Sequence, residues 1–401
     1  MIKVIDGGIT AAKGFTAAGV HCGIKAGKKD LALVVSECPA ATAAMFTTNK
    51  VAAAPVVFDK EQLQKSPLTS AIIANSGIAN ACTGERGMQD CQTMAQKTAD
   101  VLSVPVEQIL VASTGVIGHY LFIDKIKKGI KLAASELSPE KHLDAEIAIM
   151  TTDTRPKEYA VEVATDEGNF RIGGMTKGSG MIKPNMATML TFLTTDADVA
   201  PEHLDFALRQ AVEHSFNRIS VDNDTSTNDT TAILANGKSG VKEIVPTSPL
   251  YAEFCEALQT VCIELAKMLV KDGEGTTKLI EIQVNNAAND SDALQGARAI
   301  ADSYLVKTAM YGEDPNWGRI MCALGYAGIE LVPEKIQLRL NSVPILQTNF
   351  EQPTSRVDAR KALEAEEVLI SVDLGLGNSS ATVWTSDLSH EYVDINAKYT
   401  T

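Results

Sequence analysis

One stretch near the middle of the chain reads Lys177-Gly178-Ser179-Gly180-Met181-Ile182-Lys183-Pro184-Asn185-Met186-Ala187-Thr188-Met189-Leu190. Its glycines and its Pro-Asn pair predict an irregular loop up to Thr188. The apolar run Met189 to Leu193 that follows predicts a buried strand. Thr188 is therefore expected to open a strand at the end of a loop, where a hydroxyl group is well placed for chemistry.

The Thr188 hydroxyl needs a base before it can act as a nucleophile. An internal threonine has no activating base of its own, whereas an N-terminal threonine has an α-amine, with a pKa of about 7.7 to 8.0, that can take the hydroxyl proton. Cleavage of the chain before Thr188 would create this nucleophile. The alternative reading also stands, because threonine is common at the start of strands for its β propensity.

A second candidate segment, Ser113 to Gly118, directly follows an expected strand, Ile109 to Ala112. A Thr-Gly pair at the end of a strand, here Thr114 and Gly115, can aim a hydroxyl and a backbone N–H at one point. That arrangement stabilises an oxyanion. A tight turn between a strand and a helix is the simpler reading of the same residues.

Length and composition limit the class of protein. The 401 residues exceed the ~250 to 300 at which one hydrophobic core usually stops growing, so two domains or lobes are expected. Hydrophobic residues make up 45% and charged residues 21%, which excludes a disordered, collagen-like or coiled-coil chain. The 36 basic and 50 acidic residues give a net charge of −14 without a basic stripe, and this argues against a nucleic-acid partner.

The order of the expected elements predicts an α+β, mixed α/β fold. Apolar runs that read as strands are Leu31–Val35, Ala71–Ala74, Ile109–Ala112, Ile336–Leu340, Val368–Val372 and Ala381–Trp384. Helices are expected at Met88–Leu102, Asp124–Leu137, Pro201–Phe216, Pro249–Lys271 and Asp292–Val306. In the fourth helix an apolar stripe at helical spacing, Phe254, Leu258, Val261, Leu265 and Met268, predicts core.

Other kinds of site are disfavoured by their spacing. The six histidines are scattered and form no zinc-helix pair, so no metal site is expected. The segment Asp222 to Asn228 resembles the start of a calcium loop, but it lacks the turn glycine and the final glutamate, and it is expected either to line a site or to form a structural turn. Gly173 to Ser179 has two glycines five apart, but Ser179 stands at the position where a phosphate-binding loop needs its lysine.

Cysteine usage and the N-terminus point to a cytoplasmic protein. The seven cysteines are an odd number without a Cys-x-x-Cys pair, which favours reduced, inert thiols. The N-terminal residues Met1 to Gly8 lack the apolar core of a signal peptide, and neither apolar stretch, Leu31 to Phe46 or Cys255 to Val270, is free enough of charged or proline residues to span a bilayer.

These motifs together resemble the glutamate N-acetyltransferases (ornithine acetyltransferases) of arginine biosynthesis, a family of self-cleaving N-terminal-nucleophile enzymes. The resemblance runs end to end through Asn75–Gly84, Ser113–Gly118, Met150–Thr154, Lys177–Leu190, Arg218–Thr230, Asp314–Arg319 and Asn396–Thr401. It implies a two-lobed, sandwich-like ornithine-acetyltransferase/aminopeptidase-type fold with mixed sheets and flanking helices. It also implies cleavage between Ala187 and Thr188 into an α chain, 1–187, and a β chain, 188–401, that share one active site.

The resemblance also implies residue roles. Thr188 matches the family's nucleophile, and Thr114 and Gly115 match its oxyanion-hole pair. The substrate-binding positions match Thr151, Lys177, Thr188, Glu274, Asn396 and Thr401, although Thr152 or Thr154 fits the first of these as well. Ile78 stands where the family usually has Asn, which concerns a local contact and not a catalytic position.

The implied reaction moves an acetyl group from N2-acetyl-L-ornithine to L-glutamate by double displacement, without a cofactor. Ornithine carries amines and a carboxylate, so Glu274 suits its ammonium group and Lys177 its carboxylate. The family assembles as two copies of the cleaved αβ unit, a heterotetramer. Three alternatives remain open: an enzyme that also uses acetyl-coenzyme A, an aminopeptidase of the same self-cleaving fold, and a binding protein that never matures.

Overall fold

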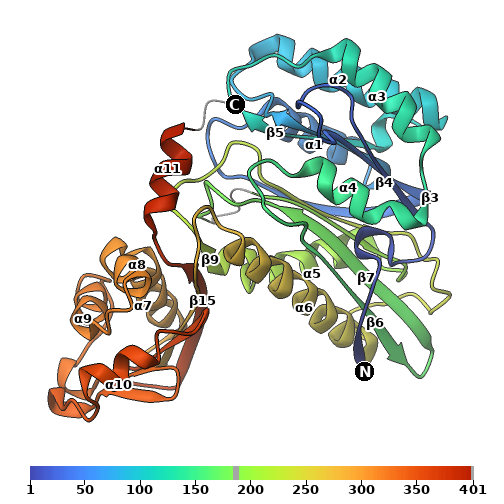
Figure 1. Ribbon diagram of the computed structural model, residues 1–401. Coiled ribbons are helices and arrows are strands. Elements are labelled where there is room, and N and C mark those ends of the chain that lie inside the picture. The colour runs from blue at the N-terminus through green and yellow to red at the C-terminus, as the bar shows by residue number, and fades with distance from the viewer. Residues whose placement is uncertain (184–188, 399–401) are drawn as a thin grey trace. The chain divides into compact units, whose positions relative to one another are not determined.

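The computed structural model describes residues 1–183 and 189–398 (Figure 1). It divides into two compact units. The first comprises Met1–Asn217 and Asp224–Leu269, and the second comprises Arg218–Asn223 and the chain from Val270 onward. Each unit contains its own mixed sheet and its own helices, which confirms the expected mixed α/β fold with two lobes.

The sheet of the first unit contains nine strands among the described residues. Eight follow the order β1-β6-β7-β8-β10-β3-β4-β5, and β2 pairs with β3 beside this path. The pairs β8–β10 and β4–β5 are parallel and the others are antiparallel. The strands are β1 Ile2–Ile5, β2 Phe15–Val20, β3 Leu31–Phe46, β4 Leu68–Ile78, β5 Ile109–Val116, β6 Glu158–Thr165, β7 Gly168–Lys177, β8 Leu190–Thr195 and β10 Thr230–Ala235.

This sheet is strongly curved. Four strands separate β7 from β5, so about 24 Å would lie between them in a flat sheet with a strand spacing of ~4.8 Å. Yet Lys177 at the end of β7 is within hydrogen-bond distance of Thr114 in β5. The long strand β3 contributes to the bend, because its register on β4 shifts between Val35 and Ala40. The curvature brings residues far apart in the sheet order to one place.

Helices cover both faces of the part of the sheet formed by β3, β4 and β5. Side chains alternate along β4: Ile73 joins the core under α2 and α3, and its neighbour Ile72 joins the core under α4. Phe254 of α6 packs against Phe170 of β7. The helices are α1 Ala54–Lys65, α2 Gly84–Leu102, α3 Ile123–Ser135, α4 His142–Ile149, α5 Pro201–Glu213 and α6 Pro249–Lys271.

Helix α6 has the bounds that the sequence predicts. In the expected apolar stripe, Phe254, Leu258, Val261 and Leu265 are fully buried, and Met268 is partly buried. Pro249 stands at the first position of the helix, where proline's missing N–H costs nothing. The stripe is therefore core, as predicted.

The second unit contains a six-stranded sheet, counted over the described residues, in the order β13-β12-β14-β11-β15-β9. The pairs β11–β14 and β15–β9 are parallel, so this sheet is also mixed. Its strands are β9 Ile219–Ser220, β11 Leu279–Ala287, β12 Gln337–Leu340, β13 Val343–Leu346, β14 Glu367–Asp373 and β15 Ser379–Ser386. Its helices are α7 Asp290–Asp302, α8 Tyr304–Tyr311, α9 Trp317–Gly325, α10 Arg356–Lys361 and α11 His390–Lys398.

The single helix expected at Asp292–Val306 is wrong, because the chain breaks at Ser303. Ser303 is extended, with φ −72° and ψ 109°, and its hydroxyl accepts a hydrogen bond from the Val306 N–H at 3.3 Å. Serine competes with the helical backbone in this way, so it ends α7 and caps α8.

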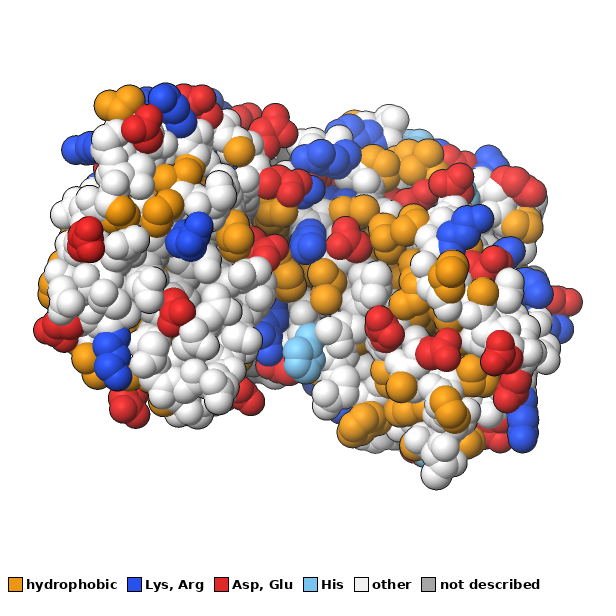
Figure 2. Space-filling view, turned by 90° about the horizontal axis from the view of Figure 1, so that it is seen from below, with side chains coloured by type: hydrophobic (Ala, Val, Ile, Leu, Met, Phe, Trp, Pro, Cys, Tyr) orange, Lys and Arg blue, Asp and Glu red, His pale blue; other side chains and the backbone are white. Residues whose placement is uncertain are grey.

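Surface features agree with the composition. No helix within residues 1–183 and 189–398 is long and apolar enough to cross a membrane. On the face shown in Figure 2, acidic and basic side chains are interspersed and no field of lysine and arginine gathers. The seven cysteines, all among the described residues, are free thiols, of which Cys91 and Cys262 are buried and Cys82 and Cys322 are exposed.

Candidate active site

Thr114 and Gly115 lie near the end of β5, in parallel register with Ser76 and Gly77 of β4. Gly115 has φ +129°, a conformation that residues with a Cβ rarely adopt. A Cβ on Gly115 would also lie 2.3 Å from the carbonyl carbon of Gly77. Only glycine fits here, so the backbone N–H of this residue is held in one place by the packing of two strands.

Lys177 ends β7 and reaches Thr114. Its side chain is buried, and its Nζ donates a hydrogen bond to Thr114 Oγ1 at 3.2 Å. Because the ammonium group occupies a lone pair of the hydroxyl oxygen, the hydroxyl can direct its own proton elsewhere. The structure thus joins two residues that are 63 positions apart and that the sequence singled out separately.

Asp153 organises the loops around Lys177. Its carboxylate accepts hydrogen bonds from the backbone N–H groups of Thr151 at 2.9 Å and Gly178 at 2.7 Å, and it pairs with Lys157 Nζ at 2.6 Å. Burial would raise the pKa of Asp153, but the charges of Lys177 and Lys157 outweigh it and hold the pKa well below its ordinary value. This buried group is therefore a carboxylate that fixes the approach to Lys177.

The three candidate threonines of this segment lie beside the same loop. The backbone of Thr151 is bound to Asp153, and the Thr152 hydroxyl is 2.6 Å from the hydroxyl of Ser179. The segment that contains Thr151, Thr152 and Thr154 is thus tied to the Lys177–Ser179 turn. Which of the three contacts a substrate stays a prediction.

The loop Asp222 to Asn228, which resembles the start of a calcium loop, is bonded to the residues around Thr114. Asn228 Nδ2 donates to the carbonyl oxygens of Ala79 at 2.6 Å and Ser113 at 2.8 Å. Thr225 forms a bridge with Ile182, and its hydroxyl donates a hydrogen bond to the carbonyl oxygen of Lys183 at 3.3 Å. The loop therefore serves as a structural turn, because it ties β5 to the segment after Lys177; that it also lines a site stays a prediction.

Asp229 is an unusual group beside this loop. Its side chain is buried, and neither carboxylate oxygen has a hydrogen-bond partner in the described part of the chain. Burial raises the pKa of Asp229 well above its ordinary value, against the opposing effects of the Met189 backbone, Lys177 and Thr47. The next residue, Thr230, donates its N–H to the Met189 carbonyl at 3.0 Å, so Asp229 stands beside the start of β8.

Glu274 and Asn396 lie in the second unit. Glu274 follows α6, and Asn396 is on α11, where its Nδ2 donates to Glu274 Oε2 at 2.8 Å. The structure thus brings the predicted site residues together in two directly bonded pairs, Thr114 with Lys177 and Glu274 with Asn396. Ala187, Thr188 and Thr401 lie outside the described residues.

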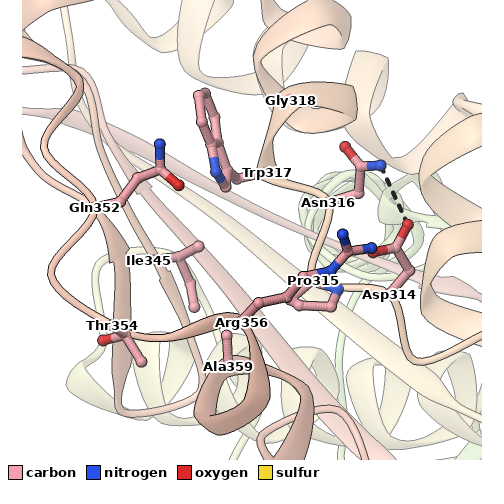
Figure 3. A pocket seen from close by; sticks show the side chains of 10 residues that line it. All are labelled: Asp314, Pro315, Asn316, Trp317, Gly318, Ile345, Gln352, Thr354, Arg356 and Ala359. Carbon is pink, nitrogen blue, oxygen red and sulfur yellow. Dashed lines mark hydrogen bonds and ion pairs between the residues drawn. The ribbon is translucent and has the colours of Figure 1, made fainter.

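Asp314–Gly318 of the Asp314–Arg319 motif line part of a pocket of about 310 Å³ in the second unit (Figure 3). Asp314 accepts a hydrogen bond from Asn316 Nδ2 at 3.2 Å and pairs with Arg356 of α10 at 2.9 Å. Trp317 begins α9 and lines the same pocket. The motif thus connects α9 to α10 within this unit.

Sequence reasoning missed three charged residues of the first unit's centre, Lys25, Asp153 and Asp229. Asp153 lies inside a segment that the sequence marked, and the lysine four positions later is the signal that could have identified a pair. Asp229 lies inside another marked segment, Arg218–Thr230, whereas Lys25 carries no local signal and only the fold places it there.

Comparison with known proteins identifies the family. The ArgJ family model matches residues 16–401. "Arginine biosynthesis bifunctional protein ArgJ" of Symbiobacterium thermophilum is 49% identical over 400 residues, which are 99% of each chain. The protein of the same name from Streptococcus mutans is 46% identical over the whole of both chains.

A solved structure of a relative agrees with this result. A crystal structure of arginine biosynthesis bifunctional protein ArgJ from Bacillus halodurans is 44% identical, with a TM-score of 0.50, and the alignment covers 52% of this chain and 98% of that one. The ornithine acetyltransferase of Mycobacterium tuberculosis complexed with ornithine is 40% identical, with a TM-score of 0.43, and the alignment covers 46% and 99%. The chain studied here belongs to the ArgJ family.

Proposed function

We propose that this protein is a glutamate N-acetyltransferase of arginine biosynthesis, which transfers the acetyl group of N2-acetyl-L-ornithine to L-glutamate. One observation carries the proposal: the Lys177 ammonium bonds to the Thr114 hydroxyl, next to the conformationally fixed Gly115 and at the start of the segment that leads to Thr188. A hydroxyl and an N–H at one point suit an acyl-transfer oxyanion, and the adjacent cation suits an amino-acid carboxylate. Family membership supplies the substrates.

Maturation is proposed to cleave the chain between Ala187 and Thr188, which gives chains 1–187 and 188–401. The relatives support this: full-length ArgJ proteins align along all of this chain, whereas the solved Bacillus halodurans chain matches over 98% of its own length and only 52% of this one. A solved chain of about half length is expected when a precursor is cut in two. The new α-amine of Thr188 then serves as the base for its own hydroxyl.

Transfer proceeds in two displacements. Thr188 Oγ gives its proton to the α-amine and attacks the acetyl carbonyl carbon, while Thr114 and the Gly115 N–H stabilise the oxyanion. The C–N bond breaks and ornithine leaves with the proton on its α-nitrogen, so acetyl-Thr188 remains. The amine of glutamate attacks this ester, Thr188 Oγ recovers a proton, and N-acetylglutamate leaves. No cofactor takes part in this scheme.

Substrate recognition is proposed to use both signs of charge. Lys177 suits the α-carboxylate, and Glu274, held by Asn396, suits the ammonium group of the ornithine side chain. Thr151 and Thr401 are proposed further contacts with substrate. A cytoplasmic location and a heterotetramer of two α and two β chains complete the proposal.

Thr114→Ala is expected to slow acetyl transfer by roughly 10²-fold, as the loss of one oxyanion donor does. The fold should be retained, because the side chain's contact with Lys177 is at the edge of the core. Steady-state kinetics check this: kcat should fall while KM changes little. A sharp rise in KM with an unchanged kcat would make Thr114 a binding residue only.

Deletion of residues 396–401 is expected to impair transfer strongly and to leave the cleavage at Thr188 intact. The deletion removes Asn396, the hydrogen-bond partner of Glu274, whereas the groups around Lys177 remain. Loss of a tail that excludes water would also divert acetyl groups to hydrolysis. Ornithine release measured with and without glutamate checks this; transfer to glutamate at the full-length rate would remove Asn396 and Thr401 from the site.

The names of the relatives support a second acetyl donor. The curated relatives are named bifunctional proteins, which favours a second activity, and we propose acetyl-coenzyme A as the second acetyl donor. An assay of N-acetylglutamate formation from acetyl-coenzyme A and glutamate decides this. An aminopeptidase of the same self-cleaving type would instead release N-terminal residues from peptides.

Analysis of the purified protein on a denaturing gel tests the proposed cleavage. Two chains are expected on a denaturing gel, and N-terminal sequencing of the C-terminal chain should begin at Thr188. An active enzyme that remains one intact chain would refute the maturation step, and a cleaved protein without acetyl transfer would refute the proposed activity.

A further inference from the structure

The backbone that carries Lys25 is fixed by a buried carboxylate. Asp30 is fully buried and accepts hydrogen bonds from four consecutive backbone N–H groups: Cys22 at 2.6 Å, Gly23 at 3.1 Å, Ile24 at 2.6 Å and Lys25 at 2.9 Å. Charge-assisted bonds of this kind are strong, and four of them hold the turn in one conformation. Lys25 therefore starts from a preorganised position.

The Lys25 side chain packs beside Gly77, the residue of β4 that lies against Gly115. A Cβ on Gly77 would lie 3.1 Å from Lys25 Cγ, and Gly77 is the residue whose backbone packs against Gly115. Lys25 Nζ donates to the carbonyl oxygen of Met150 at 2.9 Å, at the start of the segment that contains Thr151. This bond uses one of the three N–H donors of the ammonium group.

The carboxylates near Lys25 are bonded to other groups. Burial lowers the pKa of Lys25 to about 8; Asp30 and Asp153 oppose this shift, and Lys28 and Lys177 add to it. Asp30 is committed to backbone N–H groups, and Asp153 to Lys157 and to backbone N–H groups. An anionic group of a substrate would therefore be a favourable further partner for the Lys25 ammonium beside its bond to the Met150 carbonyl.

We propose that Lys25, together with Lys177, binds the α-carboxylate that the acetyl donor and the acceptor share. This inference rests on the proposed transferase function. In both amino acids the α-carboxylate and the reacting nitrogen are attached to the same carbon, so a carbonyl held by Thr114 and Gly115 places the carboxylate within a few bonds of them. Both cations lie beside this point: Lys177 bonds to Thr114, and Lys25 packs on Gly77, the residue against which Gly115 lies.

Binding of the donor carboxylate by Lys25 is expected to weaken as the pH rises. Lys25 is charged below pH 8 and loses its proton above it, so KM for the donor should rise as the pH rises through 8. Lys25→Arg keeps a positive charge over this range, so the rise should shift to higher pH or vanish.

The test compares N2-acetyl-L-ornithine with its α-carboxamide, which lacks the negative charge. Wild-type enzyme should prefer the acid, and Lys25→Gln should lose roughly 10-fold or more of this preference in kcat/KM, as expected for a charge-assisted hydrogen bond. Lys131→Gln, at an exposed position of α3, should behave as wild type. An unchanged preference for the acid in Lys25→Gln would overturn the inference.

Two controls separate the possible failures. Chain cleavage on a denaturing gel reports whether each variant folds and matures, and a wild-type enzyme that transfers no acetyl group would refute the proposed function and not this inference alone. If Lys25→Gln does not mature, the pH profiles of wild type and Lys25→Arg decide. Identical rises in KM above pH 8 in both would overturn the role of Lys25.

Discussion

Replacing Thr188 with Ala is expected to leave one uncut chain of 401 residues without transferase activity. Both cleavage and turnover need the same hydroxyl: it attacks the Ala187 carbonyl during maturation and the acetyl carbonyl during catalysis. Intact mass measurement and an acetyl-transfer assay on the same preparation check both losses.

Thr188→Ser is the matched control, because it keeps the hydroxyl group. We expect this variant to cleave and to retain part of its activity. Cleavage in the Thr188→Ala variant would show that another group cuts the chain, and turnover in that variant would show that acetyl-Thr188 is not the intermediate.

Asp153→Asn is expected to give the largest loss of stability, about 3 to 5 kcal/mol in the free energy of unfolding. Asp153 and Lys157 have side chains that are 0% and 1% exposed, so the variant would remove a carboxylate charge that lies 2.6 Å from a buried ammonium. Denaturant unfolding measures the change. The exposed Asp124, whose side chain is 89% accessible and lies 3.5 Å from Lys127, is the control, and Asp124→Asn should change the stability little.

The contribution of Asp153 to stability depends on pH, because folding lowers the pKa of its carboxyl group. The folded protein holds the pKa of Asp153 below its ordinary value, so its stabilisation is present above about pH 4 and is lost as the pH falls toward the folded-state pKa. Unfolding measured at decreasing pH should show a loss in the wild type that is smaller in Asp153→Asn. Equal slopes in the two proteins would contradict a charged Asp153.

Local patterns were sufficient for most elements. The stripe of α6 and the apolar run of β8 were predictable because burial of one face or of a whole strand imposes a periodicity on the sequence. The break at Ser303 was not, because a cap competes with helix propensity through one hydroxyl contact that periodicity does not reveal.

The site was predictable only in part. The Thr114-Gly115 pair and Lys177 were visible as unusual residues, but the contact between them depends on the curvature of a nine-stranded sheet in the described chain, which no local pattern specifies. Lys25 and Asp229 enter the same centre from other strands and loops for the same reason. Residue roles at Glu274 and Asn396 came from the family resemblance, and the structure adds the hydrogen bond between them.

The most direct measurement is the mass of the C-terminal chain after incubation with N2-acetyl-L-ornithine in the absence of glutamate. The expected chain begins at Thr188, carries the added mass of one acetyl group on that residue, and loses it when glutamate is supplied. A chain that releases ornithine and never carries an acetyl group, or carries it on another residue, would contradict the account.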